Sequence, residues 1–317
     1  MEQFDQPISY AVKHKDEAVR ATSRSGGIFT ALSDYVIAEK GVIYGCVLDD
    51  NLAAVHIRAI SKVDRDKMHG SKYIQSSIGA TYRLAKEDLE NGKVVLFSGT
   101  SCQISGFRSF LGKEYERLLC VDIVCHGVPS PEVWQKYLEW SRKGRTITAV
   151  DFRNKEKYGW ADHVETLSFS NGEETDSRVF TKLFYSHNIL RPSCYKCPYK
   201  SVIHPGDITI ADYWGIDKAA PGFNDNKGVS LVMINNEKGQ QYFNEVLATI
   251  NYVKTDMKDS MQPPLIAPYP QPAGRDQFWK DFQTRSFDYV VKKYTEDKLL
   301  TKVKRKVKNI AQKIGGV

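Results

Sequence analysis

The sequence predicts an α/β protein: a mixed β-sheet with a parallel βαβ core, flanking helices and an additional antiparallel β portion. Two short runs, 93–99 (KVVLFSG) and 117–127 (RLLCVDIVCHG), are rich in apolar residues, and the segment 103–114 between them has the length and amphipathicity of a helix. Apolar strands that alternate with helices are typical of buried parallel strands joined by a right-handed crossover. Segment 147–174 instead alternates polar and apolar residues around turn residues, which predicts an antiparallel meander.

The other elements follow from periodicity and turn residues along the chain. The glycine-rich stretch 23–27 precedes a helical pattern, so backbone N–H groups are exposed at that helix start. The remaining predicted helices are 28–40, 80–92, 177–190 and 238–250, the remaining predicted strands are 41–50, 53–60, 206–215 and 228–235, and 261–276 is a proline-rich connector. We expect an N-terminal α/β part (1–145), a C-terminal α+β part (146–290) and a basic amphipathic C-terminal helix (291–317).

Composition and charge exclude several classes of protein. The 317 residues are 41% hydrophobic, enough for a large core. No apolar run is long enough to span a membrane, and the N-terminus lacks the pattern of a signal peptide, so we expect a cytoplasmic protein. Segment 298–317 holds seven Lys or Arg and no acidic residue, which accounts for the net charge of +7. A nearly neutral body argues against nucleic-acid binding. We expect the tail to dock on the body, with peripheral contact to an anionic membrane as its alternative.

Four of the six cysteines lie at sequence positions that suit metal ligands. Cys194 and Cys197 form a Cys-x-x-Cys motif followed by proline, which suits a redox dithiol, half of a zinc site or half of an iron–sulfur site. Cys102 and Cys125 follow the two apolar strands of the βαβ unit, so both thiols are expected at one edge of the sheet. Four cysteines satisfy zinc or iron–sulfur equally, and the spacing leaves both open.

The other two cysteines have a simpler interpretation. Cys46 and Cys120 lie within apolar strands, where cysteine usually behaves as a small buried hydrophobe. A disulfide framework is not expected, because disulfides are rare in the reducing cytosol.

Seven motifs in order resemble the beta-subunit family of coenzyme F420 hydrogenases and dehydrogenases, a group of FAD- and iron–sulfur-containing proteins. The motifs, between about residues 20 and 240, are SRSGGIFTAL, GSKYIQSS, VLFSGTSCQISGFRSFL, VDIVCHGVPSP, DFRNKEKYGW, RPSCYKCPY and GDITIADYWG. The resemblance favours iron–sulfur over zinc and implies an oxidoreductase that carries FAD and a [4Fe-4S] cluster.

By this resemblance, individual residues acquire expected roles. The cysteines at 102, 125, 194 and 197 map to the family's cluster-associated cysteines, although a family cysteine could also contact FAD. Expected FAD contacts, which make 1–145 the flavin-binding part, are Arg24, Ser25, Gly26, Gly27, Gly70, Ser71, Lys72, Tyr73, Gly99, Thr100 and Gln103. Glycine-rich backbone at a helix start and nearby cations suit a pyrophosphate.

Two residues are candidates for catalysis. Lys72 is positioned to stabilise negative charge on a reduced flavin, or only to bind phosphate. His126 is positioned to relay a proton, or only to brace the cysteine loop. Arg153, Lys155 and Trp160 either face the substrate or form a salt bridge and core packing.

Partners and substrate follow from what the chain lacks relative to its relatives. Many relatives carry an N-terminal two-cluster ferredoxin domain, whereas this chain has no cysteine before Cys46. We therefore expect a separate ferredoxin-like electron-transfer protein, or a deazaflavin or nicotinamide donor. Bacterial relatives of this size tend to accompany surface-polysaccharide biosynthesis, which implies a small-molecule or glycan-precursor substrate. The alternative is a zinc-stabilised, non-redox binding module of a glycan-synthesis complex.

Overall fold

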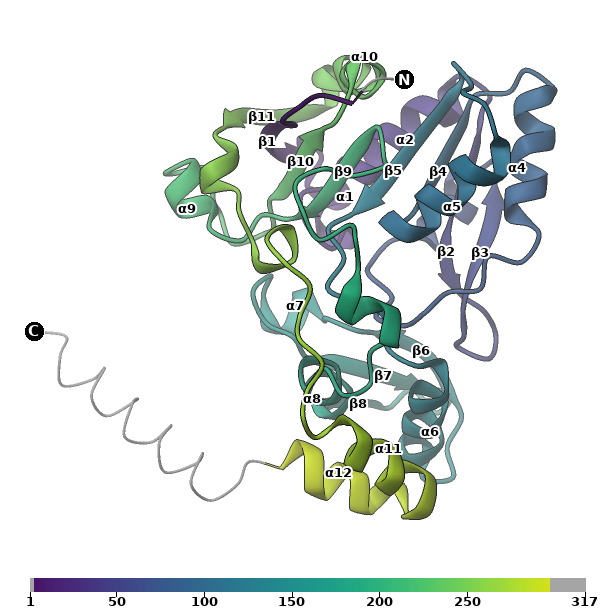
Figure 1. Ribbon diagram of the computed structural model, residues 1–317, viewed down its shortest axis with the longest axis vertical. Coiled ribbons are helices and arrows are strands. Elements are labelled where there is room, and N and C mark those ends of the chain that lie inside the picture. The colour runs from purple at the N-terminus through teal and green to yellow at the C-terminus, as the bar shows by residue number, and fades with distance from the viewer. Residues whose placement is uncertain (1–2, 297–317) are drawn as a thin grey trace, which may run out of the picture.

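An eight-stranded mixed sheet forms the upper part of the molecule (Figure 1). The computed structural model describes residues 3–296. The strand order is β11-β1-β10-β9-β5-β4-β2-β3. The strands are β1 (Ile8–His14), β2 (Val42–Leu48), β3 (Ala54–Ala59), β4 (Val95–Thr100), β5 (Leu118–Ile123), β9 (Ile208–Asp212), β10 (Ser230–Ile234) and β11 (Ile250–Thr255). The basic tail from residue 297 onward, expected as an amphipathic helix, lies outside the described residues.

The predicted parallel βαβ core is confirmed. Strands β2, β4, β5 and β9 pair in parallel, and α5 (Ser101–Leu111) connects β4 to β5. The other neighbours in the sheet pair antiparallel. The sheet is therefore mixed, as the sequence predicts.

Helices cover both faces of this sheet, and that explains why its strands are apolar throughout. On one face, α2 (Ile28–Ala38) and α10 (Glu237–Glu245) pack on residues such as Ile43 and Leu96. On the other face, α4 (Thr81–Glu90) and α5 pack on residues such as Val95 and Phe97.

A smaller layer lies below the main sheet in Figure 1. Strands β6 (Ile147–Asp151), β7 (Glu165–Phe169) and β8 (Glu174–Ser177) form the predicted antiparallel meander. A second core packs this sheet against α6 (Pro131–Arg142), α8 (Val179–Tyr185), α11 (Arg275–Thr284) and α12 (Phe287–Thr295). The aromatic rings of Trp134, Tyr137 and Phe180 lie at its centre.

Residues on both sides of position 145, the expected boundary, contribute to the main sheet. Strands β9, β10 and β11 come from the C-terminal half and join β5 and β1. The short helices are α1 (Glu17–Thr22), α3 (Lys62–Asp66), α7 (Lys155–Tyr158) and α9 (Ile216–Ala219), with 3₁₀ turns η1 (Pro192–Lys196), η2 (Leu247–Thr249), η3 (Met257–Asp259) and η4 (Pro263–Leu265). Within residues 3–296, every helix is too short or too polar to cross a lipid bilayer.

Candidate functional site

Cys102 and Cys125 lie at the same edge of the main sheet. Strands β4 and β5 are parallel and pair Thr100 with Ile123, so the chain leaves both strands at this edge. Cys102 is the second residue of α5, and its Sγ lies 3.2 Å from the Thr100 hydroxyl. Cys125 follows β5 by two residues. The segment 99–103 forms the end of β4 and the first turn of α5.

Backbone hydrogen bonds hold the Cys-x-x-Cys segment against the loop that follows Cys125. The Arg191 N–H donates to the Val128 carbonyl at 3.0 Å, and the Ser130 N–H donates to the Ile189 carbonyl at 2.9 Å. Cys194 lies in η1, and its Sγ accepts a hydrogen bond from the Val128 N–H at 3.5 Å. Two segments far apart in sequence thus bring their cysteines to one place.

Gly127 permits this close approach. Its φ of +135° is one that side chains rarely adopt. A Cβ at this position would lie 2.9 Å from Leu190 Cδ1 and 3.6 Å from Cys194 Cβ. The backbone conformation and the closeness of the Leu190 side chain therefore favour glycine at this position.

Cys125 is half-buried, and its thiol lies within electrostatic reach of other cysteines. Burial is the main cause that raises its pKa, to about 11, while Lys200 and the Gly127 N–H lower it. Cys194 and Cys102 raise it further, because a second thiolate nearby repels the first.

The thiol of Cys194 has a similar environment. Its pKa is raised by burial and then by Cys197 and Cys102, and is lowered by the Val128 N–H. The Cys194 thiol therefore lies within electrostatic reach of Cys102 and Cys197. Among the residues that the structure describes, no group of three or more Cys, His, Asp or Glu side chains has the arrangement of a metal-binding site.

The other two cysteines lie apart from this group. Cys120 is fully buried within β5, and burial raises its pKa. Cys46 lies in β2, where burial raises its pKa and the Lys72 ammonium lowers it.

The stretch Arg24–Gly27 is tied to strands β1 and β10. The Ser25 hydroxyl donates to the Val229 carbonyl at 2.6 Å, and the Gly26 N–H donates to Ser230 Oγ at 2.9 Å. A Cβ on Gly26 would lie 2.0 Å from the Val12 carbonyl oxygen, so strand packing alone demands this glycine. Gly27 takes a left-handed φ of +91° as α2 begins.

Arg24 differs from its neighbours because part of its guanidinium has no partner. Its Nη1 donates to the Arg153 carbonyl, whereas Nε and Nη2 are buried and make no hydrogen bond within the described part of the chain. Burial lowers the pKa of Arg24, and Arg153 lowers it further. The Nε and Nη2 edge is one of those with which arginine binds carboxylates and phosphates bidentately. This open edge of Arg24 is chemically suited to an oxyanion.

The side chain of Lys72 is hydrogen-bonded to backbone carbonyls. Its Nζ donates to the carbonyls of Lys67, at 3.1 Å, and His69, at 2.8 Å. Burial lowers the pKa of Lys72 to about 8, an effect that Cys46 opposes. Gly70, two residues earlier, has a φ of +76° and open space around its Cα, and Ser71 is half-buried.

Gly99, Thr100 and Gln103 lie at the N-terminus of α5, where Thr100 and Gln103 form a capping box. Gln103 Oε1 accepts from the Thr100 N–H at 3.0 Å, and Gln103 Nε2 donates to Ser76 Oγ at 2.8 Å. A Cβ on Gly99 would lie 3.0 Å from Gln103 Oε1. These side chains cap the helix that carries Cys102.

The imidazole of His126 packs against another histidine and several aromatic side chains. Its Nε2 lies 2.8 Å from Nε2 of His187, and its ring contacts Phe184, Tyr185 and Tyr269. Burial lowers its pKa to about 3, with further lowering by His187. His126 is therefore neutral at physiological pH.

Arg153 and Trp160 take structural positions. Arg153 is buried, forms an ion pair with Asp212, and donates to the Trp160 carbonyl at 2.7 Å. The Trp160 ring stacks on Trp214 with centroids 5.0 Å apart. Lys155 Nζ donates to three backbone carbonyls, those of residues 20, 23 and 227.

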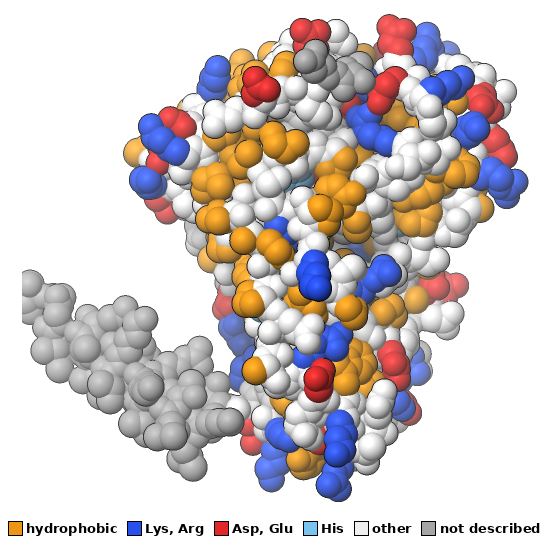
Figure 2. Space-filling view, in the orientation of Figure 1, with side chains coloured by type: hydrophobic (Ala, Val, Ile, Leu, Met, Phe, Trp, Pro, Cys, Tyr) orange, Lys and Arg blue, Asp and Glu red, His pale blue; other side chains and the backbone are white. Residues whose placement is uncertain are grey.

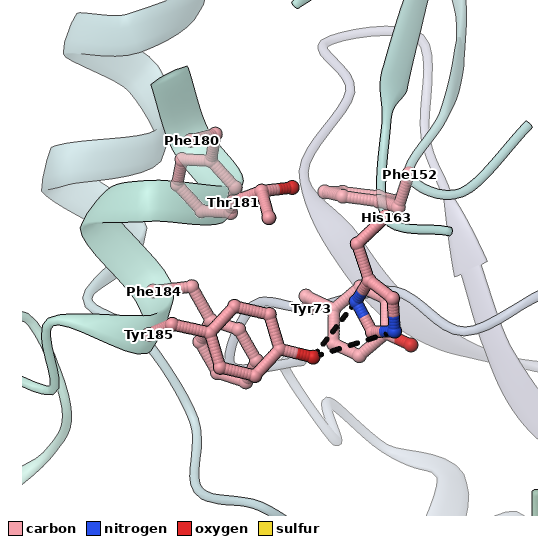
Figure 3. Close-up of a pocket in the computed structure, with 7 residues that line it drawn as sticks. All are labelled: Tyr73, Phe152, His163, Phe180, Thr181, Phe184 and Tyr185. Carbon is pink, nitrogen blue, oxygen red and sulfur yellow. Dashed lines mark hydrogen bonds between the residues drawn. The ribbon is translucent and has the colours of Figure 1, made fainter. Parts of the chain in front are cut away.

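An aromatic pocket, not expected from the sequence, lies beside Arg153 (Figure 3). Its lining residues are Tyr73, Phe152, His163, Phe180, Thr181, Phe184 and Tyr185. The Tyr185 hydroxyl is 2.7 Å from His163 Nδ1, and the Tyr73 hydroxyl accepts from Arg153 at 3.2 Å. Burial lowers the pKa of His163 to about 3, and Arg153 adds to this effect. Four of these residues lie on α8 and the other three come from separate segments, so no local pattern reveals the whole pocket.

The family assignment comes from a comparison of the whole sequence. The model that describes the C-terminal part of the coenzyme F420 hydrogenase/dehydrogenase beta subunit matches residues 92–260, which is more than half of the chain. The chain belongs to this family. Its matched region contains all four cysteines discussed above. Membership in the coenzyme F420 hydrogenase/dehydrogenase beta-subunit family gives the chain a role connected with oxidoreductases.

A solved structure supports the fold of this family member. A chain of the F420-reducing [NiFe] hydrogenase complex from Methanosarcina barkeri, solved as a xenon derivative, superposes with a TM-score of 0.53 at 19% sequence identity. The match covers 80% of this chain and 85% of that chain. No curated protein matches the sequence.

Proposed function

We propose that this protein is an oxidoreductase that depends on FAD and a [4Fe-4S] cluster. The observation that supports this most is the arrangement of Cys102, Cys125, Cys194 and Cys197: the first two follow parallel strands that end at one edge of the sheet, and the Val128 N–H, three residues after Cys125, donates to Cys194 Sγ at 3.5 Å. Four thiolates are a complete ligand set for such a cluster. Cluster sulfurs are stabilised by nearby N–H groups and positive charge, and the Val128 N–H and Lys200 supply both here. When bound, the cluster accepts and releases single electrons.

The flavin would use the donors that the fold leaves open. Arg24 offers the bidentate edge of a buried guanidinium, and α2 starts four residues later without a side-chain cap. Both features suit a pyrophosphate. Gly70 adds open backbone surface. Ser25, Thr100 and Gln103 are already hydrogen-bonded within the protein, so their proposed part is to shape the site.

The proposed roles of Lys72 and His126 are to support the redox groups through charge and packing. Lys72 would place an ammonium with a pKa of about 8 beside the flavin site. His126, neutral and bonded to His187, would brace the loop that presents Cys125. The wider proposal is that a ferredoxin-like, deazaflavin or nicotinamide donor supplies electrons to reduce a glycan precursor.

Anaerobic purification tests this function. We expect brown protein with about four iron atoms per chain and bound flavin. Separate Cys→Ser replacements at 102, 125, 194 and 197 should each lower the iron content, whereas Cys46→Ser, a half-buried cysteine outside the group, should leave it unchanged. Colourless protein with stoichiometric zinc and no flavin would instead establish the non-redox binding module.

A further inference from the structure

A cavity of about 300 Å³ lies between the edge strand β3, the segment 74–77 and the start of α6. Backbone hydrogen bonds hold this segment beside the strand: the Ser77 N–H donates to the Ala54 carbonyl at 2.9 Å, and the Ser77 carbonyl accepts from the His56 N–H at 2.8 Å. Toward α6, the Gln75 N–H donates to the Pro129 carbonyl at 3.4 Å. The volume is at the lower end of the range of small-molecule sites, roughly 300–1,000 Å³, so the cavity suits one compact ring.

The inner wall of this cavity is apolar. Its buried residues are Ala54, Ile74 and Trp134. The Trp134 Nε1–H donates to the Leu52 carbonyl at 2.7 Å, so the indole has no polar group left for a ligand. This wall therefore offers van der Waals contact to an apolar face of a bound molecule.

The more exposed wall carries uncharged polar side chains. Gln75, Ser77 and Gln135 line the cavity, and in the part of the chain that the structure describes their side chains make no hydrogen bond. Each of these amides and hydroxyls can both donate and accept. A purely apolar ligand that displaced water from them would leave them unpaired, which costs binding free energy. The wall is therefore matched to a ligand with hydrogen-bonding groups of its own.

The lining of the cavity offers no cation to an anionic ligand. Its residues, all within 3–296, include no Lys, Arg, Asp or Glu. Helix α6 starts with Pro131, whose nitrogen carries no hydrogen, and Glu132 follows in the first turn. Figure 2 shows acidic side chains, in red, where the hairpin between β2 and β3 lies in Figure 1. An anion in the cavity would lose water without gaining a cation, so phosphates and carboxylates are disfavoured.

Ser76 connects the cavity to the proposed flavin site. Ser76 lines the cavity, and its Oγ accepts from Gln103 Nε2 at 2.8 Å. Gln103 also caps α5, the helix that carries Cys102. A ligand in the cavity would therefore be one side chain away from a residue expected to contact FAD.

We propose that this cavity binds an uncharged hexose ring of the substrate. The apolar wall would contact a C–H face of the ring, and the free amides and hydroxyl would pair with its hydroxyl groups, each of which donates and accepts. The inference rests on the proposed function, because it takes the bound sugar to be part of the glycan precursor that the oxidoreductase reduces.

Saturation-transfer NMR titrations of the anaerobically purified holoprotein test this site, with the methyl pyranosides of glucose, galactose and mannose as probes. At least one of the three should bind with a dissociation constant in the millimolar range or lower. For the hexoside that binds best, the double variant Gln75→Met/Gln135→Met should raise the dissociation constant about tenfold, because methionine keeps the length of the side chain and removes its amide. Absence of binding by all three hexosides overturns the proposal.

The matched control replaces two glutamines away from the cavity. Gln6 precedes β1 and Gln241 lies on α10; both are exposed, and within residues 3–296 neither side chain is hydrogen-bonded. The variant Gln6→Met/Gln241→Met should bind the hexoside within about twofold of the unmodified protein. Equal weakening by the two double variants, or no weakening by either, overturns the proposal.

The uronic acid of the same hexoside tests the preference for an uncharged ring. It carries a carboxylate in place of the primary alcohol and is otherwise identical. At neutral pH it should bind at least about fivefold more weakly than the hexoside, because the cavity supplies no cation. Tighter binding of the uronate overturns the proposal.

The affinity for FAD separates a sugar site from a cofactor site. Both double variants should bind FAD like the unmodified protein. If Gln75→Met/Gln135→Met loses affinity for FAD and keeps its affinity for the hexoside, the cavity belongs to the adenine end of the cofactor and the proposal is overturned. Iron- and flavin-loaded protein that binds no hexoside rejects this site and leaves the proposed function intact. Protein that binds the hexoside through Gln75 and Gln135 but contains zinc and no flavin keeps the site and overturns the proposed function.

Discussion

His204 Nδ1 lies 2.9 Å from Asp122 Oδ2, and both side chains are buried. The Ser101 hydroxyl lies 3.2 Å from the same imidazole nitrogen, and Thr209 donates to the other Asp122 oxygen at 2.5 Å. This network joins the loop after the Cys-x-x-Cys segment to the first residue of α5, next to Cys102. The network therefore connects the loop after Cys197 to the start of α5, which carries Cys102.

Replacing Asp122 should destabilise the protein. In Asp122→Asn an amide nitrogen faces either His204 or Thr209, so one buried hydrogen bond to a carboxylate is lost. We expect the free energy of unfolding to fall by about 2 kcal/mol, measured by urea denaturation. Asp50→Asn, an exposed carboxylate without a hydrogen bond from another side chain in the described residues, is the control and should unfold like the unmodified protein. Identical midpoints for the two variants would contradict the assigned role.

Gly127→Ala should loosen the cysteine site. The new Cβ would strain a left-handed backbone and press on the Leu190 side chain, which lies beside Cys194. We expect a loss of unfolding free energy of more than about 1 kcal/mol and a lower iron content per chain.

Gly144→Ala is the matched control for this change. Gly144 also has a positive φ, +82°, but a Cβ there meets nothing within 4 Å. It should cost about 1 kcal/mol of stability and leave the iron content unchanged. If both variants retain full iron, packing at Gly127 does not position Cys194.

Arg24→Lys should weaken flavin binding while keeping the charge. Lysine cannot reproduce the bidentate Nε and Nη2 edge that the fold leaves open. We expect the dissociation constant for FAD to rise about tenfold, equivalent to about 1.4 kcal/mol, measured by fluorescence titration of apoprotein. Lys227→Met, an exposed cation paired with Glu17, should bind FAD normally. An unchanged affinity in Arg24→Lys would place the pyrophosphate elsewhere.

Asp281 should make stability depend on pH in acid. Lys293, at 2.6 Å, and Tyr294, at 2.7 Å, lower its pKa to about 2. Because this folded-state pKa lies below the unfolded one, the stabilisation is complete above about pH 4 and is lost as the pH falls toward 2.

The corresponding test compares Asp281→Asn with the unmodified protein by urea denaturation at several pH values. The difference in unfolding free energy should be largest near neutral pH and shrink toward pH 2. Glu132→Gln, an exposed carboxylate on α6 with no hydrogen bond in residues 3–296, should show a small and nearly constant difference. A difference for Asp281→Asn that grows in acid would reverse the assigned sign.

Some features of the site follow from local sequence. The apolar runs at 93–99 and 117–127 with a helix between them predict the parallel unit, and the structure confirms that β4 and β5 pair in parallel. Since parallel strands end at one edge, the common location of Cys102 and Cys125 follows as well. Burial of Cys120 and the antiparallel meander also follow from residue periodicity.

Only the tertiary structure decides which polar groups remain open. Arg24 meets the Arg153 carbonyl across 129 residues, and its free edge depends on that contact. The Lys72 ammonium donates its hydrogen bonds to nearby backbone carbonyls, and Gly26 is required by strand packing. Periodicity reports which face of an element is buried. The partner of each buried polar atom depends on contacts between distant segments, and these exist only after the chain has folded.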